Sequence, residues 1–155
     1  MTSGALLATT SGTSRRTAIV HVWDMSAEKE LYRLKHYSEV KCVSFHNDLI
    51  ITLCYDSLRI WKKTTGELLH TLMHKGGNTF DISPDGTMIA VAHSGNIYMG
   101  FPGGVTIWSL TNFNKITELE LDSVFEVYFQ TNKKIIATVH SNTSKNGQIY
   151  LITAY

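Results

Sequence analysis

The chain has 155 residues, of which 43% are hydrophobic, 10% aromatic and 17% charged. This composition suits one globular domain rich in β structure and excludes a disordered chain. Fourteen Lys and Arg residues oppose thirteen Asp and Glu residues, so the net charge of +1 gives no general attraction to nucleic acid or to an anionic membrane. We therefore expect no nucleic-acid partner.

The amino-terminal residues lack a basic segment and an apolar run of signal-peptide length, and no apolar run reaches the ~18 residues of a membrane span. The expected location is cytoplasmic, with the nucleus or the periphery of a membrane as alternatives. Cys42 and Cys54 fall inside expected strands, where they are expected to be small buried side chains and not disulfide partners.

Short alternating segments separated by turns fill the chain and predict about fourteen β-strands. The expected strands are residues 5–10, 18–23, 30–34, 40–45, 49–54, 58–61, 67–72, 79–83, 88–92, 105–108, 115–121, 124–129, 134–139 and 148–153. No segment keeps a helical period for three turns. The short, regular spacing of the turns predicts antiparallel meanders and not β-α-β units.

One four-residue phrase, apolar, polar, apolar and bulky, returns four times along the chain. The copies are Val20-His21-Val22-Trp23, Leu58-Arg59-Ile60-Trp61, Val105-Thr106-Ile107-Trp108 and Ile149-Tyr150-Leu151-Ile152. Their last positions lie 38, 47 and 44 residues apart, close to the period of ~40–45 residues that is typical of propeller blades. The strand count amounts to about three and a half four-stranded blades, whereas a closed ring typically needs about four to eight.

An incomplete ring leaves unpaired strand edges, which associate readily. We therefore expect the chain either to be a piece of a longer protein or to be completed by a second copy or another chain. In isolation it should be oligomeric, prone to aggregation or dependent on a partner.

The repeats resemble those of the WD40 family over essentially the whole chain. The second repeat carries most of the resemblance, with His36, the strand at 40–45, Asp56 before the Trp61 phrase, and residues 65–72. The third repeat adds Ser83-Pro84-Asp85-Gly86, and the first supplies Trp23-Asp24. The resemblance implies an all-β, partial WD40-like propeller over 1–155 that acts as a non-catalytic scaffold for protein partners.

In WD40 proteins a His, a strand Ser or Thr, an Asp and the Trp form a hydrogen-bonded structural network. By position, the resemblance assigns these roles to His36, Thr52, Asp56 and Trp61. Asp56 lies one residue nearer to the Trp than the family pattern has it. The resemblance implies a structural role for these residues and no catalytic one.

A narrower similarity links residues 5–108 to the PROPPIN phosphoinositide-binding propellers of autophagy. It rests on Val40-Lys41-Cys42-Val43, the strand at 49–53, Leu68-Leu69-His70-Thr71 and Phe101-Pro102-Gly103. That family binds lipid through a Phe/Leu-Arg-Arg-Gly motif, which this sequence lacks. Arg15 and Arg16 supply an arginine pair without the glycine, and they are the candidate lipid-binding residues of this alternative.

A glycine-rich segment, residues 94–104, interrupts the third repeat and predicts an interaction loop or a simple surface loop. Tyr98, Met99 and Phe101 are its candidate partner contacts. We expect no metal and no cofactor, because the histidines lack Cys or carboxylate companions at ligand spacing. No Gly-x-Ser-x-Gly nucleophile motif occurs, so we expect no enzymatic activity.

Overall fold

The computed structural model of the chain describes residues 5–14, 17–96, 100–140 and 147–153, and in this part it contains strands and turns and no helix. The strands are β1 (Leu6–Ser14), β2 (Thr17–Asp24), β3 (Lys29–His36), β4 (Val40–His46), β5 (Leu49–Cys54), β6 (Ser57–Lys62), β7 (Leu68–Met73), β8 (Gly77–Ile82), β9 (Met88–His93), β10 (Gly103–Ser109), β11 (Lys115–Leu121), β12 (Ser123–Thr131), β13 (Lys134–His140) and β14 (Gly147–Thr153). The described strands number fourteen, as the sequence predicts.

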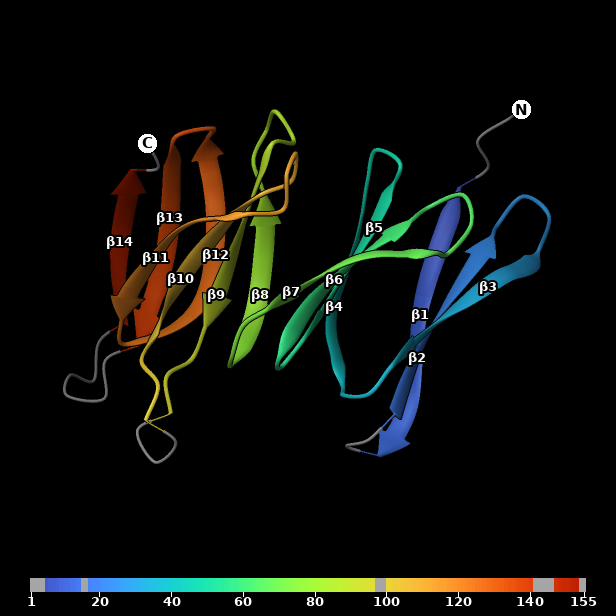
Figure 1. The fold of residues 1–155 in the computed structure, drawn as a ribbon, viewed down its shortest axis with the longest axis horizontal. Helices are drawn as coiled ribbons and strands as arrows, with labels where there is room; N and C mark the ends of the chain where they lie inside the picture. Colours follow the sequence, from blue (N-terminus) through green and yellow to red (C-terminus); the bar gives the residue numbers. More distant parts are fainter. Residues whose placement is uncertain (1–4, 15–16, 97–99, 141–146, 154–155) are drawn as a thin grey trace. The chain divides into compact units, whose positions relative to one another are not determined.

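The strands form four antiparallel meanders, each of which pairs consecutive strands (Figure 1). Two sheets have four strands, in the orders β4-β5-β6-β7 and β11-β10-β9-β8. The other two have three strands, in the orders β1-β2-β3 and β12-β13-β14. The prediction of an all-β fold with about three and a half four-stranded blades is therefore confirmed.

By internal contacts the chain divides into two compact units, Met1–Thr71 and Leu72–Tyr155. The prediction of a single domain over 1–155 stays a prediction. In the first unit, the sheet β1-β2-β3 packs on the sheet that begins with β4 through a small core. The buried members of this core are Val20, Val22, Leu34, Ile50 and Trp61. The alternation of buried and half-buried residues along β2 shows the period of two that directs one face of a strand to a core.

The turn between β6 and β7 shows how the first unit fits its two sheets together. Gly66 adopts a positive φ of 72°, and its N–H donates to the carbonyl of Lys62 over 2.8 Å. A Cβ on Gly66 would lie 2.5 Å from the Tyr32 ring, which packs over this turn from β3. The Tyr32 hydroxyl donates to the carbonyl of Lys63, so only glycine satisfies both the turn and the packing.

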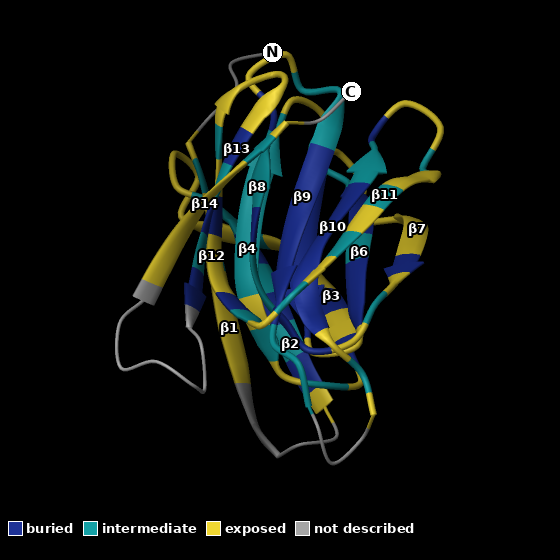
Figure 2. Ribbon diagram, turned by 90° about the vertical axis from the view of Figure 1, so that its left-hand side faces the viewer, coloured by how far each residue is buried: buried dark blue, intermediate teal, exposed yellow. Residues whose placement is uncertain are grey.

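The second unit has a larger core, formed by Ala90, Ala92, Val105, Ile107, Val124, Val127, Ile135, Ala137 and Val139. These side chains join the β9–β10 pair to the β12–β13 pair. Figure 2 draws most of β9 in the dark blue of buried residues. Polar contacts reinforce the packing, because Asp81 accepts from the backbone N–H of Phe129 over 2.7 Å.

The glycine-rich segment is shorter than the sequence suggests, because its last two residues begin β10. Gly104 pairs with Glu120 on β11, and a Cβ on Gly104 would lie 1.9 Å from the carbonyl oxygen of Leu119. Glycine is needed there because another backbone approaches closely, and the surface-loop prediction for 94–104 is wrong at this end.

Candidate functional site

Three of the four residues assigned to the structural network meet at the hydroxyl of Thr52. Trp61 Nε1 donates to Thr52 Oγ1 over 2.9 Å, and His36 Nε2 lies 2.8 Å from the same oxygen. The register explains the meeting, because Ile50 pairs with Trp61 and Thr52 pairs with Arg59 on the neighbouring strand. Thr52 and Trp61 are therefore diagonal neighbours on one face of the sheet.

The network has one consistent direction of donation. Nδ1 of His36 donates to the carbonyl of Leu34 over 3.0 Å, which leaves Nε2 as an acceptor for the Thr52 hydroxyl. That hydroxyl in turn accepts from Trp61. Burial lowers the pKa of His36 to about 4, and the charge of Arg59 acts in the same direction against the opposing bond to Leu34. The imidazole is therefore neutral at pH 7 and its two nitrogens are both engaged.

Asp56 does not join this network, and the assignment by resemblance is wrong for this residue. Its carboxylate accepts from the hydroxyl of Ser38 over 3.2 Å and from the hydroxyl of Ser57 over 3.0 Å. Being one residue nearer to Trp61, Asp56 lies in the β5–β6 turn and ties this turn to the β3–β4 turn. The position that a carboxylate would take on the His36 ring is filled by the carbonyl of Leu34.

Part of the same network recurs in the first sheet. Thr9 on β1 pairs with His21 as Thr52 pairs with Arg59, and Trp23 Nε1 donates to Thr9 Oγ1 over 3.2 Å. Nδ1 of His21 lies 2.6 Å from Oε1 of Glu30.

Glu30 links the first sheet's strands through a small polar cluster. Hydrogen bonds from Arg33 and then from His21 lower the pKa of Glu30 to about 2. This carboxylate therefore stays ionised at neutral pH and forms a two-pronged pair with the Arg33 guanidinium beside it.

In the third sheet, formed by β8 to β11, the network has a different arrangement. Val91 pairs with Thr106 at the place where Thr52 pairs with Arg59, so the hydroxyl has moved from the second strand of the sheet to the third. Trp108 Nε1 is consequently buried without a hydrogen-bond partner among the described residues.

Thr106 instead contacts His93, a buried histidine that was not predicted as a site residue. Its Oγ1 lies 3.1 Å from His93 Nε2 and 3.4 Å from Glu118 Oε1. Burial lowers the pKa of His93, although Glu118 and a backbone bond at Pro102 oppose the shift. A search for hydroxyls on both inner strands of each repeat could have found this pair.

The remaining candidate residues are spread over the chain. Phe101 is half-buried, and Lys75 Nζ lies 5.6 Å from the centre of its ring. Tyr98, Met99, Arg15 and Arg16 lie outside the described residues.

In the part of the chain that the structure describes, no group of three His, Cys, Asp or Glu side chains could hold a metal ion.

The exposed aromatic residues beside the network form a second feature that the sequence analysis missed. Tyr37, in the β3–β4 turn, is 76% exposed, and Tyr55, in the β5–β6 turn, is 42% exposed. Arg59 Cζ lies 5.6 Å from the centre of the Tyr37 ring, and Lys41 Nζ lies 5.5 Å from the centre of the Tyr55 ring. We call Tyr37, Lys41, Tyr55 and Arg59 the turn patch.

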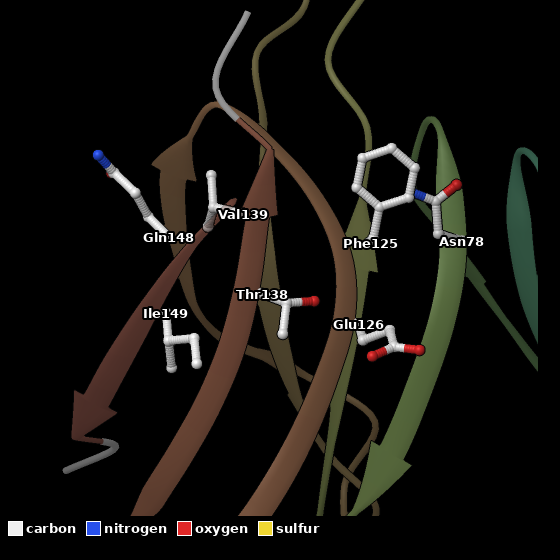
Figure 3. Close-up of a pocket in the computed structure, with 7 residues that line it drawn as sticks. All are labelled: Asn78, Phe125, Glu126, Thr138, Val139, Gln148 and Ile149. Atoms are coloured by element: carbon white, nitrogen blue, oxygen red, sulfur yellow. The ribbon is translucent and has the colours of Figure 1, made fainter. Parts of the chain in front are cut away.

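An open groove of about 620 Å³ lies in the second unit (Figure 3). Its described lining residues are Asn78, Phe125, Glu126, Thr138, Val139, Gln148 and Ile149. Asn78 is held by the carbonyl of Val124 over 2.7 Å, and Glu126 is the only ionisable side chain of this set. Glu126 pairs with Thr138 across β12 and β13, and the other lining side chains are amides and apolar groups, so the groove offers a mixed contact surface.

Four antiparallel meanders and a Thr–His–Trp network define the class of protein. The chain is part of a WD40-type propeller. The family model described as eukaryotic translation initiation factor eIF2A matches residues 51–150. The chain belongs to this eIF2A family. No curated protein matches the chain.

Solved structures agree on the fold. The chain is similar to a chain of the structure titled Kuenenia stuttgartiensis Hydrazine Synthase, with a TM-score of 0.73, 14% identity, and coverage of 89% of this chain and 43% of that one. For the Mitotic Checkpoint Complex the TM-score is 0.68, the identity 15%, and the coverage 90% and 45%.

A structure titled as that of the eukaryotic initiation factor gives a TM-score of 0.66, 13% identity, and coverage of 89% and 40%. At these identities the likeness shows the fold alone. The chain spans less than half the length of each of these three structures. Among the described residues, no helix is long and apolar enough to cross a membrane.

Proposed function

We propose that this chain forms part of a non-catalytic WD40-type scaffold that acts in translation initiation in the cytoplasm by holding protein partners. The observation that carries the proposal is the match of the eIF2A family model to residues 51–150, which include eight complete strands, β6 to β13, and parts of β5 and β14. A propeller segment fits a scaffold, because its sheets are rigid and its turns present side chains from successive blades on one surface.

The non-catalytic part of the proposal is supported by the state of the histidine network. A general base needs a free ring nitrogen near its operating pH. His36 has both nitrogens in hydrogen bonds, is 1% exposed, and has a pKa lowered to about 4 by burial. A role in holding the blade together accounts for all three properties.

The experiment is sucrose-gradient sedimentation of the tagged full-length protein from cell extract in which initiation complexes are preserved. We expect the protein to move with the small-ribosomal-subunit fractions and to return to the top of the gradient when these complexes are dissociated. A protein that stays at the top under both conditions would contradict the proposed function. Depletion of the protein should also lower the translation of a reporter messenger RNA.

The phosphoinositide alternative stays a prediction, since Arg15 and Arg16 lie outside the described residues. Flotation of the protein with liposomes that contain or lack phosphatidylinositol 3-phosphate tests it directly. Lipid-dependent flotation that is lost in the double variant Arg15→Ala/Arg16→Ala would favour this alternative over the scaffold in translation.

A further inference from the structure

The turn patch brings together two tyrosines and two cations from four successive parts of the second repeat. Tyr37 and Lys41 come from the β3–β4 turn and the start of β4, whereas Tyr55 and Arg59 come from the β5–β6 turn and from β6. Each tyrosine has a cation over its ring, at 5.5 to 5.6 Å from the ring centre. Tyrosine and arginine are the residue types that most often carry binding energy at protein interfaces.

The two turns that carry the patch are held in place. The Ser38 hydroxyl donates to Asp56 across the turns over 3.2 Å, and Asp56 also accepts from Ser57. Nη1 of Arg59 donates to the carbonyl of Lys35 over 3.0 Å, which fixes its guanidinium beside β3. The patch is therefore ordered before any partner arrives, and this reduces the entropy cost of binding.

Among the described residues, no carboxylate forms an ion pair with the guanidinium of Arg59. Arg33, on β3, shows the contrast, because it forms a two-pronged pair with Glu30 at 2.7 and 2.9 Å. Arg59 contacts a carbonyl and a tyrosine ring, and no ion pair joins it to any Asp or Glu in the described part of the chain. Nε of Arg59 is buried and also lacks a hydrogen-bond partner among these residues. An uncompensated guanidinium of this kind favours a carboxylate ligand.

We propose that the turn patch is a docking surface for an acidic peptide segment of a protein partner, with a partner carboxylate on Arg59 and an apolar side chain against Tyr37. The patch favours a peptide over a nucleic acid, because the same two turns carry the carboxylates of Glu39 and Asp56. These would repel a chain of phosphates, whereas a peptide can present its acidic groups singly. This inference deepens the scaffold function proposed above, on which it rests, by naming the chemistry of the partner.

The experiment measures fluorescence anisotropy of labelled probes with the whole protein. One probe is a short peptide that repeats Asp-Ser-Phe, the second has Asn in place of each Asp, and the third is a labelled oligouridine. The variants are Arg59→Gln and Tyr37→Ala, and Arg33→Gln is the matched control, with the same change of charge on β3 outside the patch. Because Tyr37 is 76% exposed, its truncation leaves the fold intact, and circular dichroism verifies this for each variant.

We expect the acidic peptide to bind about tenfold or more tightly than its neutral counterpart, and Arg59→Gln and Tyr37→Ala each to weaken it about tenfold. Arg33→Gln should change the affinity less than about twofold, since Glu30 already neutralises Arg33. Equal binding of the acidic and neutral peptides, unchanged binding by Arg59→Gln, or tighter binding of the oligouridine would each overturn the proposal. Peptide binding without cosedimentation would instead contradict the link to translation and leave the patch standing.

Discussion

Replacing Thr52 by Val should destabilise the first unit far more than the loss of one hydroxyl suggests. Val has the same shape, so the core stays filled, but Trp61 Nε1 and His36 Nε2 both lose their partner inside the protein. Thr52 is 0% exposed, so water does not replace the hydroxyl. Each buried unsatisfied group costs about 1–3 kcal/mol, and we expect Thr52→Val to lower the free energy of unfolding by about 2–4 kcal/mol.

The measurement is urea unfolding followed by far-ultraviolet circular dichroism, combined with a double-mutant cycle between Thr52→Val and Trp61→Phe. Because Phe has no N–H to satisfy, the Thr52→Val change should cost less in that background, by a coupling energy of about 1–2 kcal/mol. Thr71→Val, on an exposed strand position, is the matched control and should stay within about 0.5 kcal/mol of the natural protein. A loss from Thr52→Val no larger than that of the control, or the absence of coupling, would refute the hydroxyl-centred network.

Three further predictions follow from the same geometry. Val91→Thr supplies the hydroxyl that Trp108 Nε1 lacks, and it should raise the free energy of unfolding by about 1 kcal/mol in urea titrations, whereas a loss would show that the third sheet cannot accept the network. The pKa of His36 is about 4 in the folded state and about 6.5 when unfolded, so the stability that the neutral imidazole contributes is present above pH 6.5 and is lost as pH falls toward 4. The urea midpoint should therefore drop across this window, and it should drop less steeply in His36→Gln. Gly104→Ala places a Cβ against the carbonyl oxygen of Leu119 and should cost roughly 2 kcal/mol or more, with loss of amide-exchange protection along β10 and β11; unchanged protection would contradict the close approach.

The strands were predictable because their signals are local. Alternation with a period of two and turn sequences such as Ser83-Pro84-Asp85-Gly86 depend only on neighbouring residues. The structure bears this turn out, since Gly86 has a positive φ of 71° and its N–H donates to the carbonyl of Ser83. The meander order needed no further information, because short turns leave antiparallel neighbours as the simplest pairing.

The polar contacts were less predictable because they depend on register. The family pattern predicts Asp56 in the network, but at its position in the β5–β6 turn the carboxylate accepts from Ser38. The contact between His93 and Thr106 was not predictable, because it depends on the pairing of β9 with β10. In this sheet the hydroxyl lies on the third strand, whereas in the second sheet it lies on the second strand. The turn patch was not predictable for a related reason. Exposed residues in turns follow no periodic pattern, and no sequence motif indicates that a cation lies over an aromatic ring.

The second position of the repeated phrase unites these observations. It holds His21, Arg59, Thr106 and Tyr150 in the four copies, while its neighbours stay apolar. In the second sheet, Thr52 on the adjacent strand satisfies Trp61, so Arg59 is not needed for the network and its guanidinium extends to the tyrosine of a turn. In the third sheet the adjacent residue is Val91, and the same position is occupied by the hydroxyl that partners a buried histidine. A hydroxyl on the second strand therefore frees the third strand to carry a binding residue, and the turn patch lies in the sheet that meets this condition with an arginine.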